Sequence, residues 1–140
     1  MKRKLKTYAA LKRQLDQVFS EWIRRSANIT ACCSCGAVKP WKELQCGHFV
    51  SRVRLATRWE PKNCAPQCGA CNVLRRGNPI GYSQYLIRTY GPNIFAELDE
   101  QSRKPTKFSR SDLAEMIADY RGRLATIDIP DGGKLLKAYA

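Results

Sequence analysis

The sequence predicts an α+β fold, mainly helical, in which helices flank a small cysteine-rich centre. Apolar residues recur at three- and four-residue steps towards both ends of the chain, as they do in amphipathic helices. The middle instead holds all seven cysteines and the single histidine, among short apolar stretches and turns. With 140 residues, 44% of them hydrophobic, the whole chain (1–140) is expected to form one domain.

The first predicted helix covers residues 4–26, which contain no Gly or Pro. Its apolar stripe consists of Leu5, Tyr8, Leu11, Leu15, Val18, Phe19, Trp22 and Ile23. The rest of its surface carries Lys4, Lys6, Lys12, Arg13, Arg24 and Arg25. We expect the stripe to enter the core and the basic side to follow a phosphate backbone.

The second segment, residues 30–77, reads as short strands and turns that end in a helix beginning near Gly69–Cys71. Residues 78–128 return to helical patterns. Asn78 caps a helix that stops at Gly91, and Pro92 begins another short helix.

The last predicted helix opens at a capping box formed by Ser109 and Asp112. The remaining residues, 129–140, contain Pro and Gly and are expected to form a loose tail.

The net charge of +13 is unevenly distributed along the chain. Residues 1–31 carry eight Lys and Arg against two acids, residues 32–91 nine against two, and residues 92–140 eight against eight. The whole excess therefore lies on the first helix and the cysteine-bearing centre. A solvated basic surface would need no such segregation, whereas a nucleic-acid-binding face would.

The cysteines favour a metal site over disulfides. Their number is odd, no secretion signal precedes them, and four form two C-x-x-C pairs, Cys32/Cys35 and Cys68/Cys71. Four thiolates predict a closed, tetrahedral, structural zinc. Cys33 could replace Cys32 in the ligand set. The surplus Cys46 and Cys64 are expected to be small buried hydrophobic residues.

The 32 residues between the two pairs exceed the spacing of a simple zinc ribbon, and they include His48 and Asn63. A lone histidine beside glycine, between the two halves of a zinc site, suggests catalysis. The plainer alternatives are that His48 is a zinc ligand or a core residue. With four cysteines present, the ligand role is unnecessary.

The chain resembles the zinc-bearing HNH, or His-Me finger, nucleases. It has the same elements in the same order: Cys-x-x-Cys, His48, Asn63 and Cys-x-x-Cys-Asn72. The chain is still more similar to the NinG (Rap) recombination proteins of phages. The matching segments are Leu15–Ser20, Gly47–Arg52, Leu55–Trp59, Asn63, Gln67–Cys68, Cys71–Asn72 and Gly77–Asn78.

The resemblance implies a ββα-metal core and a metal-dependent endonuclease that cuts branched DNA recombination intermediates, such as Holliday junctions and D-loops. His48 would be the general base, and Asn72 would hold one Mg²⁺ or Mn²⁺. Asn63 would brace the histidine-bearing loop. Arg75 and Arg52 would either stabilise charge on the phosphate or contact the DNA backbone. The implied DNA-binding residues are Lys12, Arg13, Arg24, Arg52, Arg54, Arg58, Arg75 and Arg76.

The chain departs from the family pattern at positions where its members are expected to bind the catalytic metal. Many members have Asp-Ala-Gly-His where this chain has Gln45-Cys46-Gly47-His48, and other HNH enzymes place an acid directly before the histidine. Some relatives also have a second histidine where this chain has Ala65. Metal binding would then rest on Asn72 and substrate oxygens.

Two other functions are open: a non-catalytic zinc protein that binds branched DNA, and an RNA-binding zinc module. No run of about 18 apolar residues predicts a membrane span. The resemblance implies a phage or prophage protein in the bacterial cytoplasm. Symmetric junction cutting would suggest a homodimer, although the residues carry no dimer signature.

Overall fold

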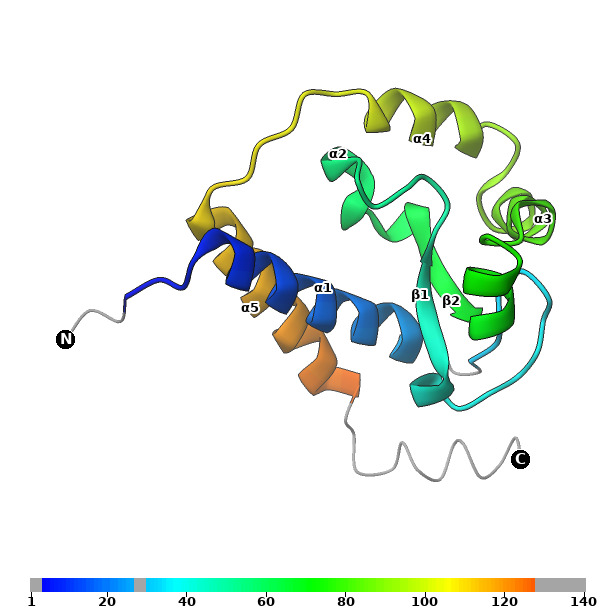
Figure 1. The fold of residues 1–140 in the computed structure, drawn as a ribbon, viewed down its shortest axis with the longest axis horizontal. Helices are drawn as coiled ribbons and strands as arrows, with labels where there is room; N and C mark the ends of the chain where they lie inside the picture. Colours follow the sequence, from blue (N-terminus) through cyan, green and yellow to red (C-terminus); the bar gives the residue numbers. More distant parts are fainter. Residues whose placement is uncertain (1–3, 27–29, 128–140) are drawn as a thin grey trace. The chain divides into compact units, whose positions relative to one another are not determined.

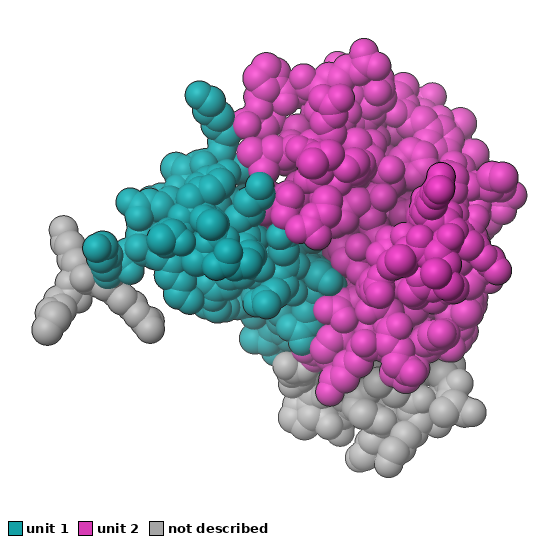
Figure 2. Space-filling model, in the orientation of Figure 1, with its two compact units in different colours: residues 1–22, 107–140 teal, residues 23–106 magenta. Residues whose placement is uncertain are grey.

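A computed structural model describes residues 4–26 and 30–127, and the chain forms two compact units. One unit comprises residues 1–22 and 107–140, and the other residues 23–106 (Figure 2). The coarse fold class is confirmed, since the described chain is mainly helical with one small two-stranded sheet, while the ββα-metal core stays a prediction. The single-domain expectation stays a prediction, and the predicted loose tail, 129–140, lies outside the described residues.

The first unit contains α1 (Tyr8–Arg25) up to Trp22 and α5 (Arg110–Ile127), which lie side by side in Figure 1. Phe19 meets Tyr120 edge to face, with ring centroids 5.2 Å apart. The Thr7 hydroxyl accepts a hydrogen bond from the Ala10 amide and so caps α1. Because the helix begins after this cap, Leu5 precedes it and is 42% exposed, so its predicted core position is wrong.

The capping box at the start of α5 is confirmed. The Ser109 hydroxyl accepts from the Asp112 amide at 3.0 Å, and the Asp112 carboxylate accepts from the Ser109 amide at 2.7 Å. These hydrogen bonds lower the pKa of Asp112. The helix then buries Leu113, Ile117, Tyr120 and Leu124.

The second unit contains the sheet. Strands β1 (Leu44–His48) and β2 (Cys64–Cys68) pair antiparallel, with Leu44 opposite Cys68 and His48 opposite Cys64. A short 3₁₀ turn precedes each strand, η1 (Trp41–Glu43) before β1 and η2 (Pro61–Asn63) before β2. The loop between the strands carries the one-turn helix α2 (Leu55–Arg58).

The helix predicted to begin near Gly69–Cys71 is a single π-helical turn, η3 (Ala70–Leu74). It ends early because Arg76, Gly77 and Asn78 all adopt positive φ angles. The next two helices are α3 (Pro79–Tyr90), capped by Asn78 as predicted, and α4 (Ile94–Ser102).

The core of the second unit lies between the sheet and these two helices. Its buried members are Cys33, Ala65, Tyr82, Leu86, Ile94 and Leu98. Phe49, directly after β1, contacts both helices, with its ring centroid 5.4 Å from that of Tyr82 and 5.5 Å from that of Phe95.

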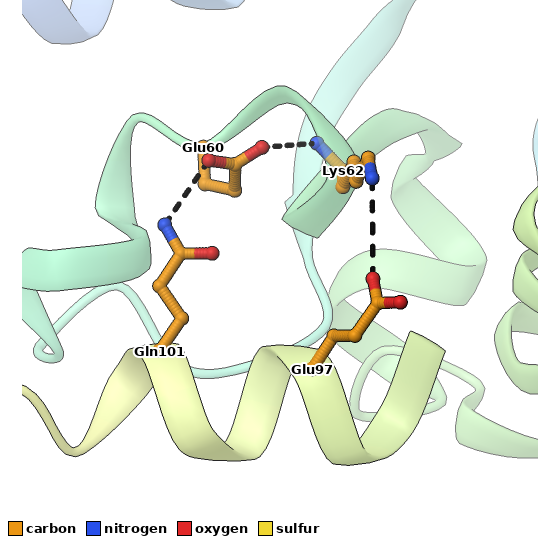
Figure 3. A network of polar contacts seen from close by, with 4 residues as sticks. All are labelled: Glu60, Lys62, Glu97 and Gln101. Atoms are coloured by element: carbon orange, nitrogen blue, oxygen red, sulfur yellow. Dashed lines mark hydrogen bonds and ion pairs between the residues drawn. The ribbon is translucent and has the colours of Figure 1, made fainter. Parts of the chain in front are cut away.

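A polar network ties the end of the inter-strand loop to α4 (Figure 3). Gln101 donates to the Glu60 carboxylate at 3.1 Å, and the other oxygen of that carboxylate accepts from the Lys62 amide. Lys62 also pairs with Glu97, their charged atoms 3.9 Å apart. Through these contacts α4 restrains the segment that leads into β2.

None of the helices in the described chain is long and apolar enough to cross a membrane.

Replacing Ser109 with Ala should lower the free energy of unfolding by about 1 kcal/mol, because the Asp112 amide loses its cap. Urea denaturation followed by circular dichroism measures this loss. Ser111→Ala, an exposed substitution on the same helix, is the matched control and should change little. Because the pKa of Asp112 is lowered on folding, its contribution is present above about pH 4 and disappears as the pH falls through the lowered value. Equal stability of the two variants would contradict the capping role.

Candidate functional site

The two C-x-x-C pairs converge on one point. The sulfur atoms of Cys32, Cys35, Cys68 and Cys71 all lie within 4.8 Å of one another. The Cys35 and Cys68 sulfurs are 3.8 Å apart, which is about the S···S separation around a tetrahedral zinc with 2.3 Å bonds. The four thiols, hereafter the four-cysteine cluster, could therefore hold a metal ion such as zinc.

The first pair sits on a tight turn. The Gly36 amide donates to the Cys32 carbonyl, and the Cys32 amide donates to the Ala37 carbonyl. Gly36 has φ +79°, a conformation that strains other residues, so glycine suits the position after Cys35. The turn directs both thiols towards the cluster.

The second pair is held by the end of β2 and by η3. The Cys71 amide lies 3.4 Å from the Cys68 sulfur, and the Asn78 side-chain amide lies 3.4 Å from the Cys71 sulfur. Burial raises the pKa of Cys71 to about 12 and outweighs the hydrogen bond from Asn78, which lowers it.

Cys32 and its neighbour Cys33 have different environments. Burial raises the pKa of Cys32, but hydrogen bonds from the backbone of Cys68, Cys35 and Ser34 outweigh it, so the pKa falls to about 7. Burial raises the pKa of Cys33 to about 12. Cys33 packs in the apolar core with Tyr82 and lies outside the four-cysteine cluster.

His48 is the last residue of β1 and is half-buried. Its Nε2 atom lies 2.8 Å from the Arg58 carbonyl oxygen. Because a carbonyl only accepts hydrogen bonds, Nε2 carries the proton and Nδ1 carries the lone pair in the neutral ring. The contact therefore sets the tautomer and the orientation of the imidazole.

Asn63 closes the loop that follows His48. Its side chain is fully buried and hydrogen-bonds twice to Val50, accepting from the amide at 2.7 Å and donating to the carbonyl at 3.0 Å. It also donates to the Thr57 carbonyl at 3.0 Å. These bonds join the two ends and the middle of the loop, which is the geometry expected of a brace. A direct catalytic role for Asn63 stays a prediction.

Tyr82 supports the same loop from α3. Its hydroxyl donates to the Gly47 carbonyl at 2.9 Å and lies 3.3 Å from the Asn63 carbonyl. Burial raises the pKa of Tyr82 well above its usual value, so the hydroxyl keeps its proton. One side chain thus ties the residue before His48 to the residue that ends the loop.

The structure does not bring Asn72 and His48 to one face of the sheet. Asn72 donates to the Gln45 side-chain oxygen at 2.7 Å. Because successive side chains on a strand alternate, Gln45 and His48 belong to opposite faces of β1. This pair of neutral amides does not by itself fit Mg²⁺ or Mn²⁺, for which proteins usually supply carboxylates.

Gly47 occupies the position at which many HNH enzymes have an acidic residue, and the structure shows what fills that space. A Cβ atom at Gly47 would collide with the amide oxygen of Gln67, a fully buried side chain. The Gln67 amide nitrogen donates to Ser34 and to the Gly77 carbonyl, both at 2.8 Å. Gln67 thus fills the space beside Gly47 and joins Ser34, in the turn of the first cysteine pair, to Gly77.

The predicted DNA-binding residues fall into two groups. Arg58 is 8% exposed and donates to the Arg52 carbonyl at 3.1 Å, while Arg24 is half-buried and lies near the carbonyls of η1 and β1. These two have structural contacts. The exposed members in the second unit are Arg52, Arg54, Arg75 and Arg76, and Lys12 and Arg13 belong to the first unit. DNA contact by any of them stays a prediction.

A second group of ligand-type side chains was not predicted. The Cys46 and Cys64 sulfurs and a ring nitrogen of His48 lie within 4.8 Å of one another. The Cys-x-His spacing on a strand could have indicated a shared face. Only the register, which sets Cys64 opposite His48, adds the third member. The prediction that Cys46 is buried is wrong, since it is half-buried at this face.

A family model described as "Bacteriophage Lambda NinG protein" matches residues 1–129. "Protein ninG" of Salmonella phage P22 is 25% identical over 113 residues, which cover 80% of this chain. The match covers 55% of that relative, so the chain spans about half its length. No solved structure matches.

Removing zinc, or replacing Cys68 with Ser, should unfold the second unit, because metal binding supplies on the order of 10 kcal/mol of folding free energy in such sites. Thermal melting followed by circular dichroism, with and without chelator, measures the effect. Cys33→Ala, next to a ligand but outside the four-cysteine cluster, is the control and should keep its zinc. A zinc-free Cys68→Ser protein that melts like wild type would overturn this prediction.

Replacing Asn63 with Ala should lower the free energy of unfolding by about 3 kcal/mol, because the Val50 and Thr57 backbone groups lose buried partners. Denaturant titration measures the loss. Asn93→Ala is a suitable control, since Asn93 is exposed and its side chain caps no helix. A change below about 0.5 kcal/mol, the usual size for surface sites, would be incompatible with the brace.

Proposed function

Since the chain belongs to the family of the bacteriophage lambda NinG protein, we propose that it is a structure-specific endonuclease that cuts branched DNA during phage recombination. In this proposal the sheet, the loop and the four-cysteine cluster form an HNH-type core. The whole-protein activity of longer relatives is part of the proposal, because this chain spans about half of the P22 relative.

The observation that carries the proposal is the setting of His48. It ends a short strand, its Nε2–H is held by the Arg58 carbonyl, and the loop after it is braced by Asn63. This arrangement presents one defined tautomer with Nδ1 as the basic atom. A general base needs a basic atom held in a defined orientation, which this contact provides.

The proposed reaction is phosphodiester hydrolysis. A water molecule attacks phosphorus and gives its proton to Nδ1 of His48. A new P–O bond forms as the bond to the 3′ oxygen breaks, and that oxygen is protonated by solvent. The products are 5′-phosphate and 3′-hydroxyl ends. The resemblance implies that the reaction depends on a metal ion, but the Gln45 and Asn72 amides do not fit a hard cation. The cleavage assay therefore compares rates with and without Mg²⁺ or Mn²⁺.

Charge in the second unit supports a nucleic-acid substrate. Residues 23–106 carry thirteen Lys and Arg against five acids. Four of these acids, Glu60, Glu97, Asp99 and Glu100, belong to η2 and α4 or border them, and Glu60 and Glu97 join the network of Figure 3. The segments next to the cysteine pairs and the loop after His48 therefore keep a nearly unopposed positive charge, which attracts phosphate; its residues are Lys39, Lys42, Arg52, Arg54, Arg75 and Arg76.

A second candidate function is a non-catalytic zinc protein that binds branched DNA. It is favoured by Gln67, which fills the space next to Gly47, and by the separation of Asn72 from His48 across the sheet. Such a protein would bind junctions and cut none. An RNA-binding module would instead prefer RNA of the same shape.

The two functions separate in one experiment. Matched linear, forked and four-way DNAs are incubated with wild type and His48→Ala, with and without Mg²⁺ or Mn²⁺. We expect wild type to cut the branched DNAs and His48→Ala to cut them about 10²–10⁴-fold more slowly, the range for loss of a general base. Equal cutting rates for the two proteins would exclude His48 as the base.

Binding measured on the same DNAs controls for folding. His48→Ala should keep the wild-type affinity for the four-way junction, and both affinities should fall steeply with salt, as phosphate contacts require. Binding without cutting in any metal would favour the non-catalytic function. Preference for an RNA of matched shape would favour the RNA-binding function.

A further inference from the structure

We propose that Cys46, His48 and Cys64 form a second metal site, distinct from the four-cysteine cluster, that takes one soft divalent cation such as Zn²⁺ and leaves one position open. The site would compete for the imidazole that the proposed nuclease needs. Only this competition rests on the proposed function. The metal site stands on the geometry of the sheet.

The backbone brings the three side chains together. Cys46 and His48 are two apart on β1 and so share a face, and Cys64 on β2 lies opposite His48. Their ligand atoms lie within 4.8 Å of one another. Tetrahedral zinc bound by sulfur and nitrogen needs separations of about 3.5–3.8 Å, so the three atoms are within about 1 Å of a ligating arrangement.

The donor types suit zinc better than magnesium. Two thiols and an imidazole are ligands for zinc and other soft or borderline cations, whereas Mg²⁺ selects oxygen. Metal-bound histidines usually donate their other ring N–H to an oxygen acceptor. The Arg58 carbonyl, 2.8 Å from Nε2, can be that acceptor, and Nδ1 is then the ligand.

Three protein ligands leave the fourth tetrahedral position for water or another small molecule. The four-cysteine cluster, in contrast, supplies a complete set of ligands. Cys64 and Cys68 begin and end β2 on the same face, so the two clusters are about 13 Å apart along the strand. One ion cannot serve both, and the sheet carries a metal-binding group at each end.

A filled second site changes what His48 can do. A nitrogen lone pair that binds a metal cannot accept a proton from water at the same time. Soft cations should therefore inhibit the proposed cleavage, with inhibition depending on Cys46. Cys46→Ala removes one ligand and leaves His48 in place, so it tests this dependence.

The experiment counts metal in the full-length, reduced chain. Wild type equilibrated with Zn²⁺ and freed of excess should retain two ions per chain, and Cys46→Ala one, as the two ligand groups require. The Cys33→Ala control should retain two. Co²⁺ added to wild type holding zinc only in the four-cysteine cluster should give thiolate–cobalt absorption that Cys46→Ala lacks. Cys64→Ala provides a second variant.

One retained ion in folded wild type, or two in folded Cys46→Ala, would overturn the second site. DNA cleavage is measured separately. The cleavage rate of each protein with added Zn²⁺ is compared with its own rate without it, and Zn²⁺ should inhibit only wild type and Cys33→Ala. If no protein cuts DNA, the nuclease proposal fails while the metal count still decides the site.

Discussion

Closure of the long segment between the two cysteine pairs is the constraint on which the second unit depends. A two-stranded sheet with five residues in each strand is marginal by itself in water. The four-cysteine cluster joins the turn at Cys32 and Cys35 to the end of β2, where Cys68 lies opposite Leu44. A metal held there would set the register of the sheet from one end, and with it the residues that face each other at the other end.

At the far end of the sheet, hydrogen bonds hold the backbone in place. Asn63 and Tyr82 hydrogen-bond to the backbone of Gly47, Val50 and Thr57. The hydrogen bond between Glu60 and Gln101 attaches the loop to α4. All of these bonds surround His48 without using its ring. A histidine held in this way has one orientation. That orientation suits the role of general base and equally the role of metal ligand. The same physical feature therefore supports both proposals.

Alternation along β1 separates two kinds of chemistry. Gln45 and Gly47 face one way, towards amide side chains that hydrogen-bond to protein partners. Cys46 and His48 face the other way, towards Cys64. Oxygen donors and soft donors are thus kept on opposite sides of one strand. This separation explains why the residues that suggested one metal-dependent centre do not assemble into it here.

The sequence by itself determined what depends on near neighbours. The helix limits at Asn78 and Gly91, the capping box at Ser109 and the two tight cysteine knuckles follow from local hydrogen bonding and backbone preference. Tertiary structure alone decided which side of β1 Asn72 meets, and that Cys64 joins Cys46 and His48. These depend on strand register and on contacts between residues 16 or more apart, and side-chain spacing along the chain carries no information about which strand positions will pair.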